Sequence, residues 1–405
     1  MINLFKMAYR DLGRNRRRTF FSALALGMGL TLLMLMAGVL SWELINGMDL
    51  SIKLNSGDLQ VRANSYDENK TSLAWADLIE NPDQVAAQIS ALPDVSVATP
   101  RLFASGIVSS GDETMGVRIL GIEPDSAANA PYRDGLVSGQ YLTASDNSGI
   151  LIGQTLADKM DLKSGDQVPL LVNTSNGDVQ QQDFTIRGIY TTHTPSYDQT
   201  IVLMPIAKAQ AITNAGSRAS TIFILLKDIR QTNPVAASLK TTQYKVITYE
   251  EVNTLLVQFN QYADSLLFVL YVIVLAIIST VIVNTLVMSV FERTREIGIL
   301  AAIGMKSGTI RTMFFIESFL LAVGGIAIGM VMGSLLVTYV GSVGIPIGNF
   351  GVTGIYLGER IYAALTLKDA VSLTITTFVV TLLAALYPAS LAARLEPVEA
   401  LHSAQ

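Results

Sequence analysis

The chain has 405 residues, of which 50% are apolar and only 15% are charged, with a formal net charge of −5. This balance excludes an ordinary soluble globular protein and indicates a membrane protein with a sizeable polar part. The absence of cysteine excludes disulfides and a lipid-anchored lipobox, so any domain outside the membrane depends on its buried core for stability.

Residues 1–18 are predicted to form an amphipathic helix that lies in the cytoplasmic membrane interface. Its apolar side carries Ile2, Phe5, Tyr9 and Leu12. Its basic side carries Lys6, Arg10 and Arg14. The alternative is that these residues are only the basic flank that commonly precedes a first membrane span.

Four charge-free stretches predict four membrane-spanning helices: Thr19–Trp42, Ser265–Phe291, Ser318–Gly358 and Ala370–Ala393. Each is long enough to cross the hydrocarbon layer, which takes about 20 helical residues. The third stretch is longer than needed, and its Gly- and Pro-containing second half predicts an extracytoplasmic loop. The expected spans are 19–42, 265–290, 308–340 and 370–393, with a loop at 341–369 and a tail at 394–405.

The distribution of charge predicts the orientation of these spans. Residues 43–264 carry 15 Lys and Arg against 25 Asp and Glu, whereas residues 1–18 carry six Lys and Arg against Asp11 alone. Because short basic segments stay in the cytoplasm, we expect both termini there and residues 43–264 outside. The first apolar run has about 24 residues, which is too long for a typical signal peptide, so we expect it to be retained.

The external region is predicted to hold two lobes. Strand–helix–strand order occurs twice, at 57–63, 81–92 and 95–102, and again at 220–228, 232–240 and 244–252. Both helices contain Asn-Pro near their start, which suits a cap followed by proline. We expect 43–102 and 220–264 to form one membrane-proximal α/β lobe, into which a β-rich lobe, 103–219, is inserted.

Within the inserted lobe, alternating apolar residues predict strands at 115–122, 148–153, 167–172 and 184–190. Asn176-Gly177 suits a hairpin turn between the last two. Residues 153–166 are predicted to form a short helix and a turn. The fold class is therefore an α-helical membrane protein with four transmembrane helices and a large extracytoplasmic α/β plus β-rich domain between the first and second helices.

Two features of the third span are candidates for packing or function. Gly325, Gly329 and Gly333 recur every four residues and allow another helix to approach closely. They either pack closely inside one subunit or form a contact that moves or that joins two subunits. Glu317 lies at membrane depth, where an acid is costly; we expect it to pair with Arg311 or another loop cation, while proton coupling is the alternative.

Several kinds of chemistry are excluded by missing motifs. The chain has two histidines, His193 and His402, and no H-E-x-x-H, so a membrane zinc protease and a metal site are not expected. It has no G-x-x-x-x-G-K-[ST], so it does not bind ATP through a P-loop. No set of residues suggests an enzyme active site or a nucleic-acid partner.

Two stretches resemble the signatures of one class of membrane protein. ERTREIGILAAIGMKSGTIRTMFFIESFLLAVGG (292–325) and LYPASLAARLEPVEALH (386–402) are similar to motifs of ABC-transporter permeases of the MacB/LolCDE/FtsX class. The order of one span, a large external domain and three spans also resembles that class, over essentially the whole chain. The resemblance implies a multi-pass protein of the bacterial cytoplasmic (inner) membrane.

The resemblance also implies a cytoplasmic coupling helix and loop at 291–307, which would bind a separate ATPase. The residues implied in this contact are Glu292, Arg293, Arg295, Glu296, Ile297, Gly298, Ile299 and Gly304. Gly304 is expected to end the helix, and Ser307 to cap the next one. The alternative is a loop whose charges only face cytosol and lipid headgroups.

The partners implied by the class are two copies of the ATPase, which hold ATP and Mg²⁺, and a second permease chain, identical or related. This chain itself would bind no cofactor. Residues 116–172 resemble the LolC/LolE lipoprotein-releasing type in order and spacing. The short NTSNGDVQQQ segment (173–182) replaces the long hairpin that docks a soluble lipoprotein carrier in the LolC type, so docking of a carrier is left open.

The expected function is extraction or export of a lipoprotein or another amphiphile, with cargo entering from the membrane lipid between the first and second spans. The predicted cargo-facing residues are Leu30, Leu33, Met36, Leu267, Val274 and Ile278. Mechanotransmission to a periplasmic or extracellular partner, such as an efflux protein or a cell-wall hydrolase, is the alternative. A membrane sensor or receptor is a third hypothesis. The cargo and the choice between homodimer and heterodimer stay open.

Overall fold

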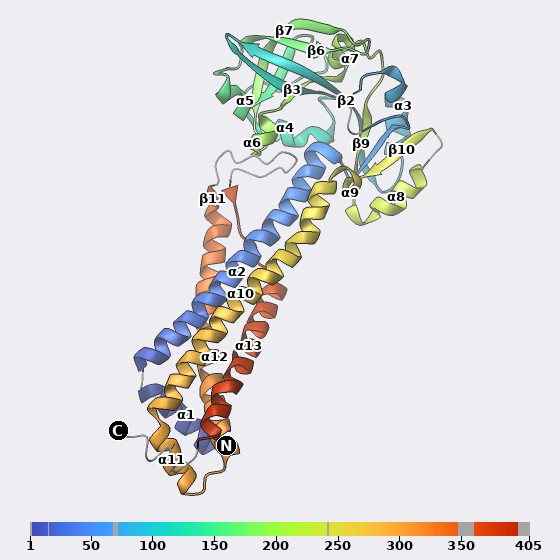
Figure 1. Cartoon of the computed structure of the whole chain (residues 1–405). Helices are drawn as coiled ribbons and strands as arrows, with labels where there is room; N and C mark the ends of the chain where they lie inside the picture. The colour runs from blue at the N-terminus through green and yellow to red at the C-terminus, as the bar shows by residue number, and fades with distance from the viewer. Residues whose placement is uncertain (1, 15, 68–71, 241–242, 347–359, 396–405) are drawn as a thin grey trace. The chain divides into compact units, whose positions relative to one another are not determined.

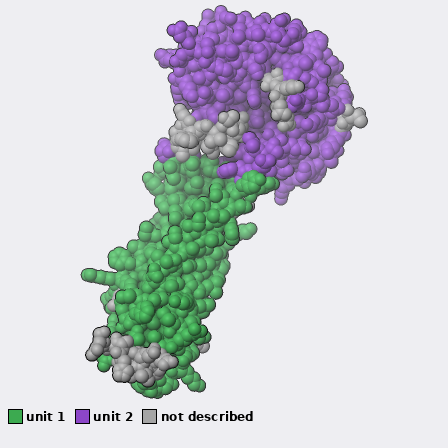
Figure 2. All heavy atoms as spheres, viewed as in Figure 1, with its two compact units in different colours: residues 1–44, 260–345, 361–405 green, residues 45–259, 346–360 purple. Residues whose placement is uncertain are grey.

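The computed structural model describes residues 2–14, 16–67, 72–240, 243–346 and 360–395, apart from the side chains of residues 2–4 and 264 (Figure 1). Residues 347–359 of the predicted loop at 341–369 and residues 396–405 of the predicted tail at 394–405 therefore lie outside the described residues. The chain divides into two compact units (Figure 2). The helical unit comprises 1–44, 260–345 and 361–405, and the sheet unit comprises 45–259 and 346–360.

The helical unit is built from long apolar helices. Its elements are α1 (Ile2–Arg14), α2 (Arg16–Ser51), α10 (Thr254–Glu292), α11 (Thr294–Ala302), α12 (Ser307–Val343) and α13 (Leu367–Ala393). The last residues of α2, 45–51, and the first of α10, 254–259, belong to the sheet unit. Within the described part of the chain, four of them, α2, α10, α12 and α13, are long and apolar enough to cross a membrane. The four predicted spans fall within these helices. The helices α2 and α10 extend beyond the predicted spans because charged residues do not interrupt a helix.

The glycine stripe of α12 packs against α2 of the same chain. A Cβ added at Gly329 would lie 2.8 Å from the carbonyl oxygen of Gly27, and one at Gly325 would lie 2.8 Å from the Leu26 side chain. The Thr31 hydroxyl donates to the Gly329 carbonyl over 3.3 Å. The small residues thus let the two helix backbones approach closely inside one chain.

In the sheet unit, the two ends of the region come together in one lobe. Strand β1 (Leu59–Ala63) pairs antiparallel with both β10 (Tyr244–Thr248) and β9 (Thr221–Leu226). Strand β9 then pairs with the first half of β2 (Val95–Ser110). The predicted strand–helix–strand halves therefore contribute neighbouring strands to one sheet, with α3 (Pro82–Ser90) and α8 (Thr232–Leu239) as their helices.

The asparagines before these helices differ from the prediction. Asn81 precedes α3, with Pro82 at its first position as expected, but the Asn81 side chain makes no capping hydrogen bond. Its backbone is left-handed, at φ 49°. Helix α8 begins at Thr232, so Asn233 lies inside it. The Asn-Pro pattern correctly predicted where both helices begin, but neither asparagine caps its helix through its side chain.

The inserted lobe continues the same sheet through β2, whose second half pairs with β3 (Glu113–Ile122) and β6 (Gln167–Asn173). The full order is β10-β1-β9-β2-β3-β8-β5-β7-β4, with β6 pairing β2 and β7. The remaining strands are β4 (Leu136–Gly139), β5 (Gly149–Gly153), β7 (Val179–Tyr190) and β8 (Ile201–Pro205). Helices α4 (Ala130–Asp134), α5 (Gln154–Lys159), α6 (Pro195–Asp198), α7 (Ile206–Ile212) and α9 (Tyr249–Val252) complete the unit.

The predicted hairpin at Asn176-Gly177 is confirmed, because β6 and β7 pair antiparallel from Asn173 and Val179 on either side of it. Strand β8 was not predicted. All five of its residues are buried, and a strand that is buried on both faces has no alternating pattern to reveal it. The strand predicted at 95–102 also continues to Ser110, because one long strand serves both lobes.

A substitution in the glycine stripe tests the packing of α12 on α2. Gly329→Ala places its Cβ against backbone and side-chain atoms of α2, at 2.8 Å from the Gly27 oxygen and 2.9 Å from the Leu30 Cβ. We expect a loss of about 1–3 kcal/mol of stability, as is typical of overpacking. The measurement is thermal unfolding in detergent. Gly324→Ala on the same helix is the control, because nothing lies within 4 Å of that Cβ; equal melting temperatures of the two variants would contradict this packing.

Candidate functional site

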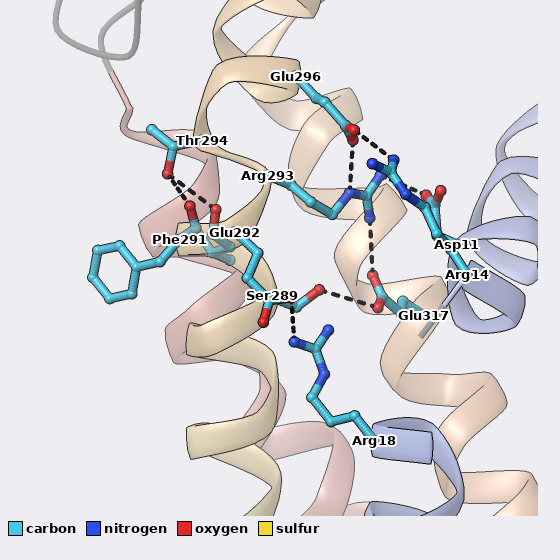
Figure 3. Close-up of polar contacts among 11 residues, drawn as sticks. Asp11, Arg14, Arg18, Ser289, Phe291, Glu292, Arg293, Thr294, Glu296 and Glu317 are labelled. Atoms are coloured by element: carbon cyan, nitrogen blue, oxygen red, sulfur yellow. Dashed lines mark hydrogen bonds and ion pairs between the residues drawn. The ribbon is translucent and has the colours of Figure 1, made fainter. Parts of the chain in front are cut away.

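The candidate site begins at the bend where α10 ends and α11 starts. Arg293 is the single residue between the two helices, and its backbone (φ −112°, ψ 12°) is not helical. The Thr294 hydroxyl lies within hydrogen-bonding distance of the carbonyl oxygens of Phe291 and Val290, at 2.9 and 3.1 Å. Figure 3 shows the polar side chains that surround this bend.

Arg293 pairs with three carboxylates from three different helices. Its Nη2 lies 2.6 Å from Asp11 Oδ2 on α1, its Nε 3.1 Å from Glu296 Oε2 on α11, and its Nη1 3.7 Å from Glu317 Oε2 on α12. Only 12% of the Arg293 side chain is exposed. Burial lowers the pKa of Arg293, but Asp11, Glu296 and Glu317 together outweigh it and raise that pKa. We call these four residues the Arg293 cluster.

Two further ion pairs lie beside the Arg293 cluster (Figure 3). Arg14 Nη1 lies 2.5 Å from Glu296 Oε1, and Arg18 Nη1 lies 2.5 Å from Glu292 Oε2. The hydrogen bond from Arg14 lowers the pKa of Glu296. Because the Arg14 side chain is 67% exposed, its pair contributes less than about 1 kcal/mol. The N-terminal segment is thus joined to the bend by one mostly buried cluster and two more exposed pairs.

Glu317 is a structural partner of the bend. Its Oε1 lies 3.5 Å from the Ser289 hydroxyl, and its Oε2 faces Arg293. The prediction that a loop cation pairs with Glu317 is confirmed, with Arg293 in place of Arg311. An acid that is 5% exposed is stabilised here by the buried guanidinium.

Helix α11 has a buried side and an exposed side. Ile297 and Gly298 are buried, and Ile297 packs with Val290, Ile310, Met313, Phe314, Ala389 and Ala392. Ile299 and Ile303 are 43% and 79% exposed, and Arg295 is also exposed. Since positions 295, 299 and 303 are four residues apart, they form one outward stripe.

The helix ends as predicted at Gly304, which has φ +97°. The Met305 amide donates to the Leu300 carbonyl and the Gly304 amide to the Ala301 carbonyl, both over 3.0 Å. This pair of bonds is a Schellman motif, which favours glycine at the left-handed position. The prediction that Ser307 caps α12 is wrong. Lys306 holds the cap position and makes no side-chain capping bond, because the chain enters the helix one residue earlier.

Apart from Gly304, which ends the helix, the predicted coupling residues therefore divide into three groups. Glu292, Arg293 and Glu296 pair within the chain, Ile297 and Gly298 are buried, and Arg295 and Ile299 face outward. Sequence analysis missed Asp11, Arg14 and Arg18 as the partners of the bend. Their charges complement those of 292–296, and both segments were assigned to the same side of the membrane, but nothing local pairs residues so far apart in the chain.

The predicted cargo-facing residues lie mostly in the interior of the helical unit. Leu30, Leu33 and Ile278 are 0%, 1% and 3% exposed and belong to one buried cluster. Val274 packs against that cluster, and Met36 and Leu267 are partly buried. Leu30, Leu33 and Ile278 are therefore buried in this arrangement, and their role as cargo contacts stays a prediction. Helices α2 and α10 are apolar all round, so no polar face indicates which side is inward.

A second polar cluster lies in the sheet unit, at the end of α2. There the helix passes into a π-helical turn, Ile52–Ser56. The Leu54 carbonyl accepts hydrogen bonds from Arg101 Nη1 at 3.0 Å, from Tyr132 at 3.1 Å and from Tyr197 at 3.3 Å. Arg101 Nη2 also lies 3.3 Å from Asn129 Oδ1. We call these donors and Asn129 the Arg101 cluster.

Arg101 is fully buried, at 0% exposure, and within the described residues no carboxylate lies within ion-pair distance of it. Burial lowers the pKa of Arg101 and raises the pKa of Tyr197 well above its usual value. Phe223 lies under the guanidinium, 3.5 Å from ring centre to Cζ. Carbonyl and aromatic groups at the end of a helix thus stabilise this charge.

The same turn is tied to the start of α10. The Ser51 hydroxyl lies 2.5 Å from Asn253 Oδ1, and Asn253 Nδ2 lies 3.0 Å from the Ser56 hydroxyl. Asn253 directly precedes α10, so one buried amide links the end of α2 to the start of α10. Among the residues that the structure describes, no group of His, Asp and Glu could hold a metal ion.

Comparisons with known proteins match nearly the whole chain. A MacB-like periplasmic core domain matches residues 19–242, and an FtsX-like permease C-terminal model matches residues 268–397. The lipoprotein-releasing system transmembrane protein LolE of Haemophilus influenzae is 24% identical over 327 residues, covering 77% of this chain and 78% of LolE. LolC of Neisseria meningitidis is 21% identical over 399 residues, covering 95% and 93%. The periplasmic region of MacB from Actinobacillus actinomycetemcomitans is 15% identical, with a TM-score of 0.35, over 50% of this chain and 96% of that structure.

Arg293→Gln tests the Arg293 cluster. The substitution leaves Asp11 and Glu317 buried without their cation, and breaking such a pair typically costs about 3–5 kcal/mol. We expect a clear fall in melting temperature in detergent. Arg295→Gln is the matched control, because Arg295 lies two residues away and is exposed, so its loss should cost under about 0.5 kcal/mol. If the two variants have the same melting temperature, the cluster does not stabilise the helical unit.

Arg101→Ala tests the Arg101 cluster. It removes two hydrogen bonds and leaves a cavity beside Leu54, so we expect a loss of about 3–5 kcal/mol. Limited proteolysis of the full-length chain should then cut faster between residues 45 and 57. Arg118→Ala, at an exposed position of β3, should leave the cleavage rate unchanged. Equal rates in the two variants would show that Arg101 does not hold the turn.

Proposed function

Because the chain belongs to the class of ABC-transporter permeases that combine a MacB-like periplasmic core domain with an FtsX-like permease C-terminal part, we propose that it couples a cytoplasmic ATPase to movement of its sheet unit outside the membrane. The resemblance expected from residues 292–325 and 386–402 is confirmed by these matches. Membership of the class implies an ATPase partner, and in this proposal the partner alone hydrolyses ATP.

The observation that carries the proposal is the outward stripe of α11. Ile303 is 79% exposed and Ile299 43% exposed, on a helix whose opposite side is buried. Exposed apolar side chains beside a cation, here Arg295, are typical of a surface that binds a protein partner. We therefore assign the ATPase contact to Arg295, Ile299 and Ile303, and assign Glu292, Arg293 and Glu296 to holding the helix in place.

Movement of α11 would pass through the ion pairs to α1 and through the bend to α10. Helices α2 and α10 are each continuous over 36 and 39 residues, which suits rigid-body transmission. In the sheet unit, the Arg101 cluster and Asn253 hold the end of α2 and the start of α10. These contacts support a device in which the two helices move the sheet unit together.

The cargo in this proposal is a lipoprotein or another amphiphile, as the names of the LolE and LolC relatives suggest. Because Leu30, Leu33 and Ile278 are buried in this arrangement, we propose the exposed side of α10 as a further candidate for contact with cargo. Leu266, Ile273 and Ile277, which are seven and four residues apart, are 58%, 50% and 60% exposed there. This side would meet lipid, cargo or the second permease chain.

Mechanotransmission without transport is the second candidate function. The connection between β6 and β7 is short, since Asn173 pairs directly with Val179. The described residues at this hairpin therefore provide no long arm for docking a soluble carrier. Transmission of movement to a partner outside the membrane needs no such arm, and it would use the same α11 stripe and Arg101 cluster.

Purification from native membrane tests the ATPase contact. We expect an ABC ATPase to co-purify with the wild-type chain, and Ile303→Asp to weaken its retention by about tenfold or more, since a buried apolar anchor typically contributes that much. Arg295→Glu should act in the same direction. Arg311→Glu is the matched control, because Arg311 is exposed on α12 outside the stripe. Full retention of the ATPase by both stripe variants would rule out this surface.

A further inference from the structure

An open groove lies in the helical unit between α1, the start of α2 and α12. It encloses about 830 Å³. Three arginines line it, Arg10, Arg14 and Arg16, together with Tyr9, Phe20 and Leu320. Neither the ATPase contact nor the Arg101 cluster uses this groove.

The groove keeps an excess of positive charge. Asp11 is the acid that lines it, and its carboxylate is already paired with Arg293 at 2.6 Å. Among the described residues, no carboxylate lies within ion-pair distance of Arg10 or Arg16. Arg16 Nε makes a weak bond, 3.3 Å, to the Gly13 carbonyl. Arg10 and Arg16 are both exposed, so their guanidinium groups are available to an anion.

The remaining wall of the groove is apolar. Phe20 is 55% exposed and Tyr9 69% exposed, and Ala23 and Leu320 continue the wall along the two membrane helices. The arginines lie where the apolar part of α2 begins, which is the depth of lipid headgroups if α2 spans the membrane. A ligand with an anionic head and an apolar tail would satisfy both parts of the groove.

We propose that this groove binds an anionic glycerophospholipid, with its headgroup phosphate on Arg10 and Arg16 and an acyl chain along Phe20 and Leu320. Arginine pairs with phosphate through parallel hydrogen bonds, and each basic residue near an anionic surface adds to the attraction. A free phosphate compound would use the arginines but would leave the apolar wall exposed. The lipid therefore fits the groove better than a soluble anion.

The bound lipid also affects the Arg293 cluster. Asp11 and Arg14 line the groove and, in addition, pair with Arg293 and Glu296. A phosphate that bridges Arg10 on α1 and Arg16 on α2 holds these helices together, and it keeps Asp11 and Arg14 beside the bend. Anionic lipid thus stabilises the contact between the N-terminal segment and α11, whether or not an ATPase is bound.

The test compares lipid retention by the full-length chain and two double variants. The protein is reconstituted in nanodiscs of phosphatidylcholine with or without phosphatidylglycerol, transferred to detergent, and examined by native mass spectrometry. We expect wild-type protein to retain phosphatidylglycerol and R10Q/R16Q to bind it about tenfold or more weakly. K6Q/R17Q is the matched control, because it removes the same charge from exposed residues of the same segment that do not line the groove.

Retention by K6Q/R17Q, together with loss from R10Q/R16Q, supports a site in the groove. Equal loss from both double variants would show that only the overall positive charge attracts lipid and would overturn the proposal. Equal retention of phosphatidylcholine would also overturn it. Competition with inorganic phosphate is a further test. If millimolar phosphate displaces the lipid, the groove is a site for soluble anions and the lipid proposal is overturned. Because the readout is bound lipid, failure of the ATPase proposal would leave this result unaffected.

Discussion

The arrangement of the helical unit depends on one guanidinium group. Arg293 is mostly buried, and a buried charge is costly unless opposite charges or hydrogen-bond acceptors accompany it. Asp11, Glu296 and Glu317 supply them from α1, α11 and α12. Any movement of α11 must therefore carry α1 and α12 with it or break a pair in a region of low dielectric. This constraint makes the bend a rigid part of the unit, while Arg295, Ile299 and Ile303 lie on the outward side of α11.

In the sheet unit, a buried arginine is stabilised by neutral groups instead of carboxylates. Arg101 has no carboxylate among the described residues, and it relies on the Leu54 carbonyl, Asn129 and the ring of Phe223. The carbonyl belongs to a π-helical turn at the end of a long helix, where carbonyl groups lack helical partners and carry partial negative charge. A buried cation is a suitable partner for such a helix end. The charge and the exposed carbonyl thus stabilise each other and fix the turn to the strands.

The bend between α10 and α11 shows that charged residues in a loop do not all contact a partner protein. Four charges in 292–296 suggested one surface for the ATPase, but three of them pair inside the chain and only Arg295 faces outward without a described ion pair. The surface assigned to the ATPase is instead formed by Arg295 and two isoleucines. The proposed lipid groove borders the inner network through Asp11 and Arg14, which links the lipid environment to the position of α11 in a way that the coupling motif alone does not suggest.

The sequence by itself determined the features that depend on local pattern. Charge-free length identified four apolar helices, Gly304 predicted a helix end because it can adopt a left-handed backbone, and Asn176-Gly177 predicted a hairpin. The motifs at 292–325 and 386–402 identified the family. Only the tertiary structure decided which side of an apolar helix is buried, and it places Leu30, Leu33 and Ile278 in the interior of the helical unit. It alone paired Asp11, Arg14 and Arg18 with residues 282, 282 and 274 positions away, because ion pairs of this kind arise from packing and leave no periodic signal in the chain.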